Sequence, residues 1–289
     1  MSELSEVSDM SEVRDPRILR TRTTPASAVR DALVIGRRNL LRNVRLPQLL
    51  VFATVQPVMF LVLFTFVFGG AIEGALPAAA GGRYLNWLVP GLMIQVAAFG
   101  SGQTALGLTE DLQNGVIDRF RALPMARSAV LAGRTGADLV RNAVVIGLMV
   151  SVGTLLGFRY QTSLVRFLAA FALALLFAHS LSWVMAAVGL KVRTPEAVQS
   201  AAFLPIFPLV FASSVFLPTE TMPAWLRAFA DHQPLTVVTN AMRGLILGEG
   251  ALPVGQDLAT EIVRALAWIA AITAVFAFVA VRSYRRIAT

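Results

Sequence analysis

Six apolar runs of about 20 residues each alternate with shorter polar segments along this chain of 289 residues. A run of that length is enough to cross a lipid bilayer as a helix. Isolated strands are excluded because they leave backbone groups unsatisfied in lipid. The pattern therefore predicts an all-α integral membrane protein whose residues 46–289 form a single six-span domain. The predicted transmembrane helices cover Pro47–Gly69, Leu88–Leu108, Leu139–Phe158, Phe167–Leu190, Ala197–Leu217 and Ile262–Val281.

The segment before the first span divides into two parts. Residues 1–23 are rich in Ser, Glu and Arg, which predicts a polar, disordered tail. In residues 24–45, apolar positions such as Val29 and Leu33 share one side of a helix, and Arg38 and Arg42 lie on the other. We expect an amphipathic helix in the membrane interface, its arginines toward anionic headgroups. A soluble surface helix has a similar pattern, but this one runs directly into a span.

A charged stretch, residues 109–134, interrupts the apolar pattern between the second and third predicted spans. Its charges predict that it lies in water rather than in lipid. Apolar residues recur within it at three- and four-residue spacing, which predicts a short amphipathic helix that ends before Pro124. That helix is either a handle for a soluble partner, or a solvated loop whose apolar stripe packs on its own bundle. The positions that define it are Glu110, Asp111, Leu112, Gly115, Val116, Arg119, Phe120, Leu123 and Pro124.

A second unusual stretch, residues 218–261, connects the last two predicted spans. Apolar and polar residues mix in its middle, and Pro223 and Pro234 break the helical pattern. Two short helices that dip into the outer leaflet and return fit this pattern better than a free loop, so we expect a re-entrant helical hairpin. Its characteristic side chains are Trp225, His232, Pro234 and Arg243.

Composition and charge support a membrane protein and orient it. The chain is 56% hydrophobic and 15% charged, with a mean hydropathy of +0.68 and no cysteine. Of its 25 basic residues, eighteen fall on one set of alternating loops and five on the other, so both termini and residues 109–134 are expected in the cytoplasm. The net charge of +8 therefore lies beside the spans, which points to membrane lipids and away from nucleic acid.

The chain has no motif for nucleotide or metal chemistry of its own. Its only lysine, Lys191, lies outside any glycine-rich phosphate loop, and no histidine pair has zinc-ligand spacing. We therefore expect no catalytic, cofactor-binding or metal site. All seventeen acidic residues fall outside the predicted spans or at their edges, Asp138 among the closest, which disfavours a proton-coupled carrier.

Uncharged polar residues are left inside the predicted spans. They form either a weakly polar path for an amphipathic substrate or ordinary hydrogen bonds between helices. The small residues Gly100, Ser101 and Gly102 predict close helix packing rather than a catalytic turn. The candidate path residues are Gln56, Gln95, Gln103, Thr104, Gln199 and Ser213.

Two residue series in this chain resemble the permease subunits of type-2 ABC exporters, and among them the daunorubicin-resistance-like multidrug efflux permeases. One series is Glu110-Asp111…Gly115…Arg119…Leu123-Pro124, and the other is His232-Gln233-Pro234-Leu235-Thr236…Met242-Arg243-Gly244. The resemblance covers nearly the whole chain. It implies that the first series is a coupling helix docking on a separate ATPase subunit and that the second belongs to the hairpin near the outer gate.

The resemblance implies a function. The expected protein is the permease half of an ATP-driven exporter of amphipathic drugs, natural products or lipids, in the plasma membrane of a bacterium. Two copies of a separate ATPase subunit would carry ATP and Mg, and a second permease chain would complete a homodimer or heterodimer. The alternatives are export of a polysaccharide or glycolipid, and a membrane-embedded lipid-modifying enzyme.

Overall fold

The computed structural model describes residues 25–45, 47–72, 74, 76–116, 127–192 and 194–287, and within them it is helical, with no strand. The all-α class is thus confirmed. The predicted polar tail, residues 1–23, lies outside the described residues. The α-helices are α2 (Pro25–Arg45), α3 (Pro47–Leu63), α4 (Gly69–Ile72), α5 (Tyr84–Gln113), α7 (Arg127–Leu155), α8 (Leu164–Lys191), α9 (Pro195–Phe211), α10 (Ala224–Ala230), α11 (Pro234–Leu247) and α12 (Leu258–Ile287); a π-helical turn, η1 (Phe64–Phe68), joins α3 to α4, and short 3-10 turns are η3 (Ala78–Ala80), η4 (Thr219–Thr221) and η5 (Glu249–Ala251).

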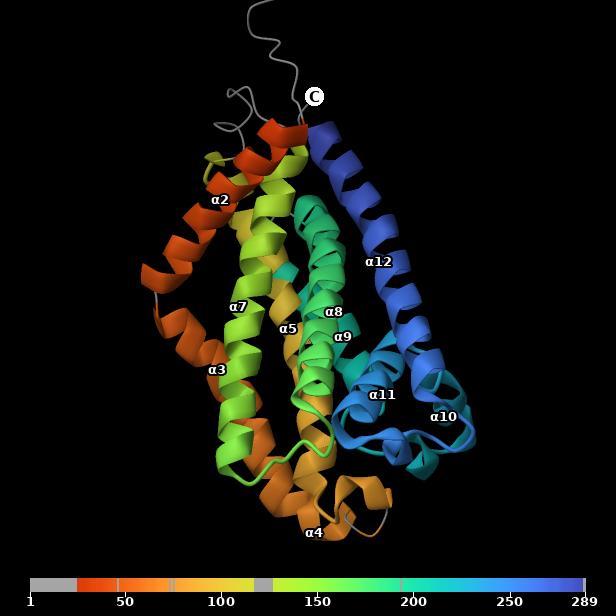
Figure 1. Cartoon of the computed structure of the whole chain (residues 1–289). Helices are drawn as coiled ribbons and strands as arrows, with labels where there is room; N and C mark the ends of the chain where they lie inside the picture. Colours follow the sequence, from red (N-terminus) through yellow and green to blue (C-terminus); the bar gives the residue numbers. More distant parts are fainter. Residues whose placement is uncertain are drawn as a thin grey trace, which may run out of the picture.

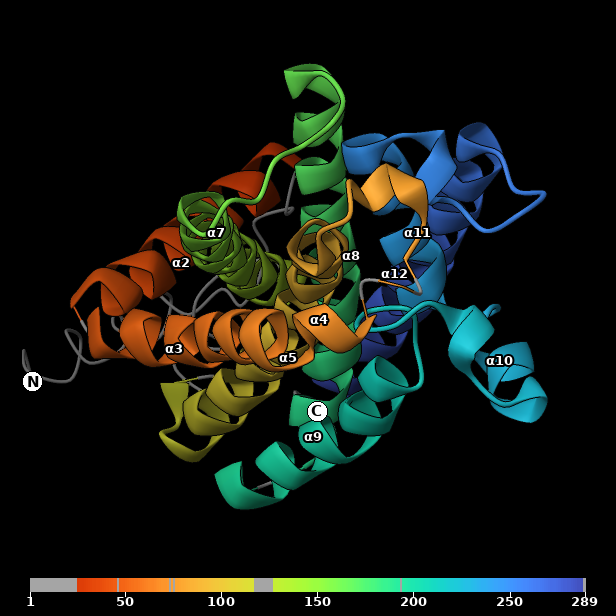
Figure 2. The ribbon, with the colours of Figure 1, turned by 90° about the horizontal axis from the view of Figure 1, so that it is seen from below.

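Helix α5 is the centre of the bundle, and α3, α7, α8, α9 and α11 all contact it (Figures 1 and 2). Small residues allow this crowding. A Cβ atom on Gly91 would overlap the backbone oxygen of Val215, and one on Gly189 of α8 would lie 2.5 Å from the carbonyl oxygen of Ala105. A Cβ atom on Gly100 would overlap the Asn142 side chain, so the close packing predicted there is confirmed.

Four helical segments of the described chain are long and apolar enough to cross a membrane: Leu50–Ile72, Ala129–Leu155, Leu164–Lys191 and Leu258–Tyr284. Helix α5 has 30 residues but is interrupted by polar and small residues, because it is surrounded by protein. Helix α9 is apolar but has only 17 residues. The structure thus supports a multi-pass membrane protein, and the count of six spans stays a prediction.

Helix α7 begins much earlier than predicted. The predicted third span started at Leu139, and residues 109–134 were expected to lie in water, but α7 starts at Arg127 and α5 continues to Gln113. Asp111 is 8% exposed and Asp138 is 4% exposed, so these acids are covered by protein. The predicted helix boundaries are therefore wrong at both ends of this stretch, because charges that pair with one another need not end a helix.

Helix α2 crosses α7 at a glycine contact rather than lying free in the interface. A Cβ atom on Gly133 would lie 2.5 Å from the carbonyl oxygen of Ala32 and 3.0 Å from the amide nitrogen of Gly36. Ile35 and Asn39 form the buried face, while Val29 and Leu33 are exposed. The exposed apolar stripe remains available to lipid.

Helix α9 ends at Phe211, six residues before the predicted end of the fifth span. Gln233 satisfies the carbonyl groups left free there, because its amide nitrogen donates to Leu209 and Ala212. Ser213 and Ser214 follow in non-helical backbone, and the amide of Ser214 donates to the hydroxyl of Thr236 at 3.1 Å. Two short helices, α10 and α11, follow. Of the predicted breakers, Pro223 is the N-cap of α10 and Pro234 is the first residue of α11.

The described ends of the chain lie at the same end of the bundle. In Figure 1 the start of α2 and the end of α12 both lie at the top, and α4, α10 and α11 lie at or near the bottom. Asp257 caps α12 at the lower end. Its carboxylate accepts hydrogen bonds from the hydroxyl of Thr260 at 2.6 Å and its amide at 2.8 Å, and these bonds hold the pKa of Asp257 below its usual value.

Candidate functional site

Five charged side chains form a continuous chain from α2 through α5 to α7. Nη2 of Arg38 donates to Oδ1 of Asp111 at 3.1 Å. Arg134 lies 3.8 Å from the other oxygen of Asp111 and 3.6 Å from Asp138. Nε of Arg141 lies 3.8 Å from Oδ1 of Asp138. Three guanidinium groups share two carboxylates, so the chain of charges is net positive. Arg38 had been expected to face lipid headgroups, but it pairs with Asp111.

The members on α7 share one face of that helix. Arg134, Asp138, Arg141 and Asn142 are spaced at four, seven and eight residues from the first, which brings them to one side. The apolar pattern alone does not predict this group, because the apolar run of the third predicted span begins only after Arg134 and Asp138. Asp138, expected at the edge of the third span, lies within Ala129–Leu155, a helical segment that is long and apolar enough to cross a membrane. Following the helical period upstream of Leu139 would have found the pattern.

The facing side of α5 supplies matching groups. Thr104 donates its hydroxyl to Oδ2 of Asp138 at 2.6 Å. Arg134 donates to the backbone oxygen of Gln103 at 3.1 Å, and Arg141 donates to that of Gly100 at 2.5 Å. Glycine at position 107 leaves the space in which the Arg134 guanidinium lies. Thr104 is therefore placed in an interhelical hydrogen bond and is fully buried.

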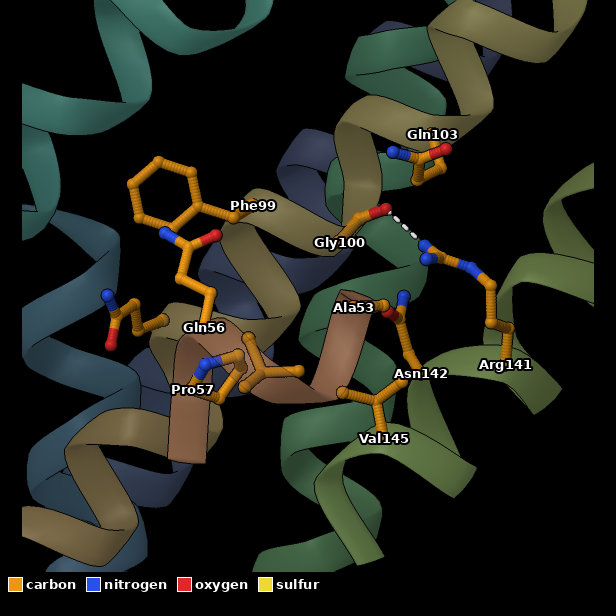
Figure 3. Close-up of a pocket in the computed structure, with 11 residues that line it drawn as sticks. Ala53, Gln56, Pro57, Phe99, Gly100, Gln103, Arg141, Asn142 and Val145 are labelled. Carbon is orange, nitrogen blue, oxygen red and sulfur yellow. Dashed lines mark hydrogen bonds between the residues drawn. The ribbon is translucent and has the colours of Figure 1, made fainter. Parts of the chain in front are cut away.

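The inner end of this chain of charges opens on a small polar cavity, which we call the α7 pocket. It has a volume of about 110 Å³. Helices α3, α5 and α7 each provide a side of it, and Figure 3 shows the side chains that surround it. Its polar lining consists of Gln56, Gln95, Gln103, Arg141 and Asn142, of which three were predicted path residues.

A larger hollow lies on the other side of Gln56 and Gln103, against α9. Its volume is about 460 Å³, and Gln199 and Ser200 contribute from α9. Phe99, Gln56 and Gln103 line both this α9 hollow and the α7 pocket. The structure therefore brings four of the six predicted path residues together, namely Gln56, Gln95, Gln103 and Gln199. Ser213, in the segment after α9, is not among them, and its hydroxyl donates to the backbone oxygen of Val210 near the end of α9.

At the opposite end of the bundle, Arg243 of α11 joins three separate segments. Its side chain is fully buried. It donates to the backbone oxygen of Trp87 at 3.2 Å and to that of Val215 at 3.0 Å. Its guanidinium carbon lies 3.6 Å from the centroid of the Trp87 ring, a cation–π contact. Arg243 thus holds α11 against the start of α5 and the segment after α9.

The other predicted hairpin residues lie nearer the surface. Trp225 on α10 is 75% exposed, and a ring nitrogen of His232 lies 2.9 Å from the carbonyl oxygen of Ala228. Pro234 is at the start of α11. A hollow of about 460 Å³ lies nearby, with Trp87, Ser214, Glu220 and Asn240 in its wall.

The residues predicted to form a coupling helix are only partly described. Glu110, Asp111 and Leu112 belong to the last turn of α5, and Gly115 follows in a turn with a positive φ of 64°. Leu112 and Val116 are therefore not on one continuous helix, which corrects the predicted stripe, because the left-handed backbone at Gly115 interrupts it. Arg119, Phe120, Leu123 and Pro124 lie outside the described residues.

Comparison with known proteins places these features in a family. The model of the "ABC-2 type transporter" family matches residues 30–247. The chain is 33% identical to a daunorubicin resistance ABC transporter permease protein of Streptomyces coeruleorubidus, over 91% of this chain and 89% of that protein. It is 29% identical to a doxorubicin resistance ABC transporter permease protein of Mycobacterium tuberculosis, over 82% and 84% of the two chains. An inner membrane transport permease of Escherichia coli is 21% identical over 69% and 77%. From this match, and from its multi-pass helical bundle, the chain belongs to the ABC-2 type transporter family.

Proposed function

We propose that this chain is the permease subunit of an ATP-driven exporter that moves amphipathic drugs, natural products or lipids out of a bacterial cell. The observation that carries the proposal is the 33% identity, over 91% of the chain, to a permease named for daunorubicin resistance. The absence of a phosphate-binding loop from the sequence agrees with hydrolysis on a separate subunit. Two ATPase subunits, carrying ATP and Mg, and a second permease chain would complete the transporter.

The membrane placement in this proposal follows the charge pattern. The proposed spans are α3–α4, α5, α7, α8, α9 and α12. The end of the bundle at the top of Figure 1 would face the cytoplasm, and α10 and α11 would form a re-entrant hairpin on the outer side. The excess of basic residues on one set of loops supports this orientation. The inner membrane of the cell is the corresponding location.

Energy would enter at the cytoplasmic end of α5. The turn at Gly115 and the residues that follow connect α5 to α7, and both helices carry the chain of charges that ends at Arg141. An ATPase subunit gripping residues 109–134 would therefore pull on two helices that line the α7 pocket. The α9 hollow, with Gln56, Gln103 and Gln199, is a suitable place for cargo because it is wide and mixed in polarity.

The test is reconstitution of the chain into vesicles together with a partner ABC ATPase subunit. We expect ATP-dependent movement of daunorubicin or a fluorescent phospholipid, lost when the phosphate-binding lysine of the ATPase subunit is replaced. The permease alone should show no ATP hydrolysis above background. An assembled, ATP-hydrolysing complex that moves none of these compounds would contradict the proposal, as would hydrolysis by the isolated chain that a substitution within it abolishes.

A further inference from the structure

The α7 pocket has the features of a built binding site rather than a packing defect. Three of its polar side chains are more than nine-tenths buried: Arg141 is 8% exposed, Gln95 3% and Asn142 1%. Both polar atoms of the Asn142 amide, the Oε1 atom of Gln95 and the Nε atom of Arg141 are buried without a hydrogen-bond partner. Buried polar groups are nearly always paired, so unpaired groups gathered at one cavity point to a missing partner.

The charge of the pocket selects the kind of partner. Arg141 is the only charged residue that lines the pocket, and Oδ1 of Asp138, 3.8 Å from its Nε atom, belongs to a residue outside the lining. Asp138 is already engaged by Thr104 at 2.6 Å and approached by Arg134 at 3.6 Å. A guanidinium group offers donors and no acceptor. The amides of Gln56, Gln95, Gln103 and Asn142 accommodate either role, so the pocket as a whole favours oxygen acceptors over cations.

The position of the pocket fits a ligand that arrives from the membrane. Arg141 is fourteen residues from the end of α7 at Leu155, which places it about 20 Å along the helix from that end. An ionisable residue at such a depth faces protein or a polar cavity and marks a pathway for substrate in many membrane proteins. Ala53 and Pro57 of α3 close one side of the cavity, and Val145 of α7 adds an apolar wall. Gln56, Phe99 and Gln103, which Figure 3 labels, line both this pocket and the α9 hollow.

We propose that the α7 pocket is a cargo subsite that binds a carboxylate or carbonyl oxygen of an amphipathic molecule, while the apolar remainder of that molecule lies in the α9 hollow. Arg141 would donate to the oxygen, with the neighbouring amides completing its hydrogen bonds. The pocket holds only a small group, at about 110 Å³, against about 460 Å³ for the α9 hollow. The inference rests on the proposed export function only in naming the ligand as cargo, since binding itself needs no ATP.

The test uses the purified full chain and four probes built on one skeleton, a dansyl fluorophore on an undecyl chain. The four probes differ only at the end of the undecyl group, which carries a carboxylate, a methyl ester, an amine or a methyl group. We expect the carboxylate to bind about tenfold more tightly than the methyl-terminated probe, as for one hydrogen bond to a charged group, with the ester between them and the amine weakest. Dansyl fluorescence measures the affinities.

Three variants locate the binding site. Ala53→Leu fills the α7 pocket without changing a charge and should remove the preference for the carboxylate. Arg141→Gln should lower carboxylate affinity about tenfold and leave the methyl-terminated probe unchanged. Gln199→Leu alters only the α9 hollow and should affect all four probes alike. Thermal unfolding of each variant reports whether it is folded. If Arg141→Gln does not fold, the subsite is tested by Ala53→Leu and by the order of the four probe affinities.

Equal binding of the four probes by the wild-type chain would overturn the subsite, and so would a carboxylate preference that survives in Ala53→Leu. These results are separate from those that test export. ATP-driven transport with no effect of Ala53→Leu on binding would refute the subsite and leave the proposed function standing. Probe selectivity without ATP-driven transport would support the subsite and contradict the proposed function.

Discussion

The guanidinium group of Arg134 lies where a side chain on Gly107 would have to be: a Cβ atom at position 107 would overlap it. The two residues are on different helices, α7 and α5. The space left by Gly107 lets Arg134 lie 3.8 Å from Asp111 and 3.6 Å from Asp138 while it donates to the carbonyl oxygen of Gln103. A glycine on one helix is thus the condition for the ion pairs made by the other.

Replacing Gly107 with alanine should therefore displace Arg134 and leave both carboxylates with less compensation. We expect a loss of about 3 kcal/mol in stability, near the cost of breaking a buried ion pair. Thermal or denaturant unfolding of the purified chain in detergent measures it. Gly136→Ala on α7 is the matched control, since a Cβ atom there meets nothing within 4 Å. Equal effects of the two substitutions would mean that Arg134 adapts without loss.

A second prediction concerns Arg243, at the end of the bundle opposite the two described chain ends. Arg243→Met keeps a long side chain but removes the guanidinium donors that Arg243 directs at the carbonyl oxygens of Trp87 and Val215. The buried carbonyl oxygen of Val215 would lose its hydrogen bond, which costs about 1–3 kcal/mol, and the cation–π contact with Trp87 would be lost as well, so the folded chain should be destabilised. Arg243→Lys should rescue only part of the loss, because an ammonium group lacks the planar fork that reaches both segments. Unfolding curves of the two variants check the order. Full rescue by lysine would show that only the charge matters.

The third prediction is topological. Because basic residues are concentrated on one set of loops, both termini should be cytoplasmic. A cysteine introduced near Thr289 should not react with a membrane-impermeant thiol reagent in intact cells, and should react once the cells are opened. The chain has no native cysteine to confuse the assay. Labelling in intact cells would show that the C-terminus lies outside the cell and would contradict the predicted orientation.

The fourth prediction concerns the partner surface in residues 109–134. Phe120→Ala should weaken assembly with the ATPase subunit by about 2 kcal/mol, as for an aromatic anchor at an interface, and should leave the permease folded. Arg119→Glu should also weaken assembly, more at low salt than at high salt, since screening acts mainly on exposed charge. Pull-down affinity and thermal stability are measured on the same variants. Unchanged affinity together with reduced permease stability would show that this stretch packs on its own bundle.

Much of the fold followed from local pattern alone. The apolar runs located helices α3, α5, α7, α8, α9 and α12, because a run of about 20 mainly apolar residues is typical of a helix that crosses a membrane. Pro223 and Pro234 located the starts of the short helices α10 and α11, since proline has no amide hydrogen and stands at helix starts. The glutamines of the candidate path could be found as polar interruptions of apolar runs.

Tertiary structure decided what the charges do. In sequence, Asp111, Arg134 and Asp138 indicate water, because an isolated charge is costly to bury. In the folded chain they are paired across α5 and α7, and pairing depends on neighbours that are distant in sequence, such as Thr104 with Asp138. The same holds for Arg141, which local pattern places at a span edge and packing places at the wall of a pocket. The sequence by itself determined where helices form; which polar groups face one another was decided only by how those helices pack.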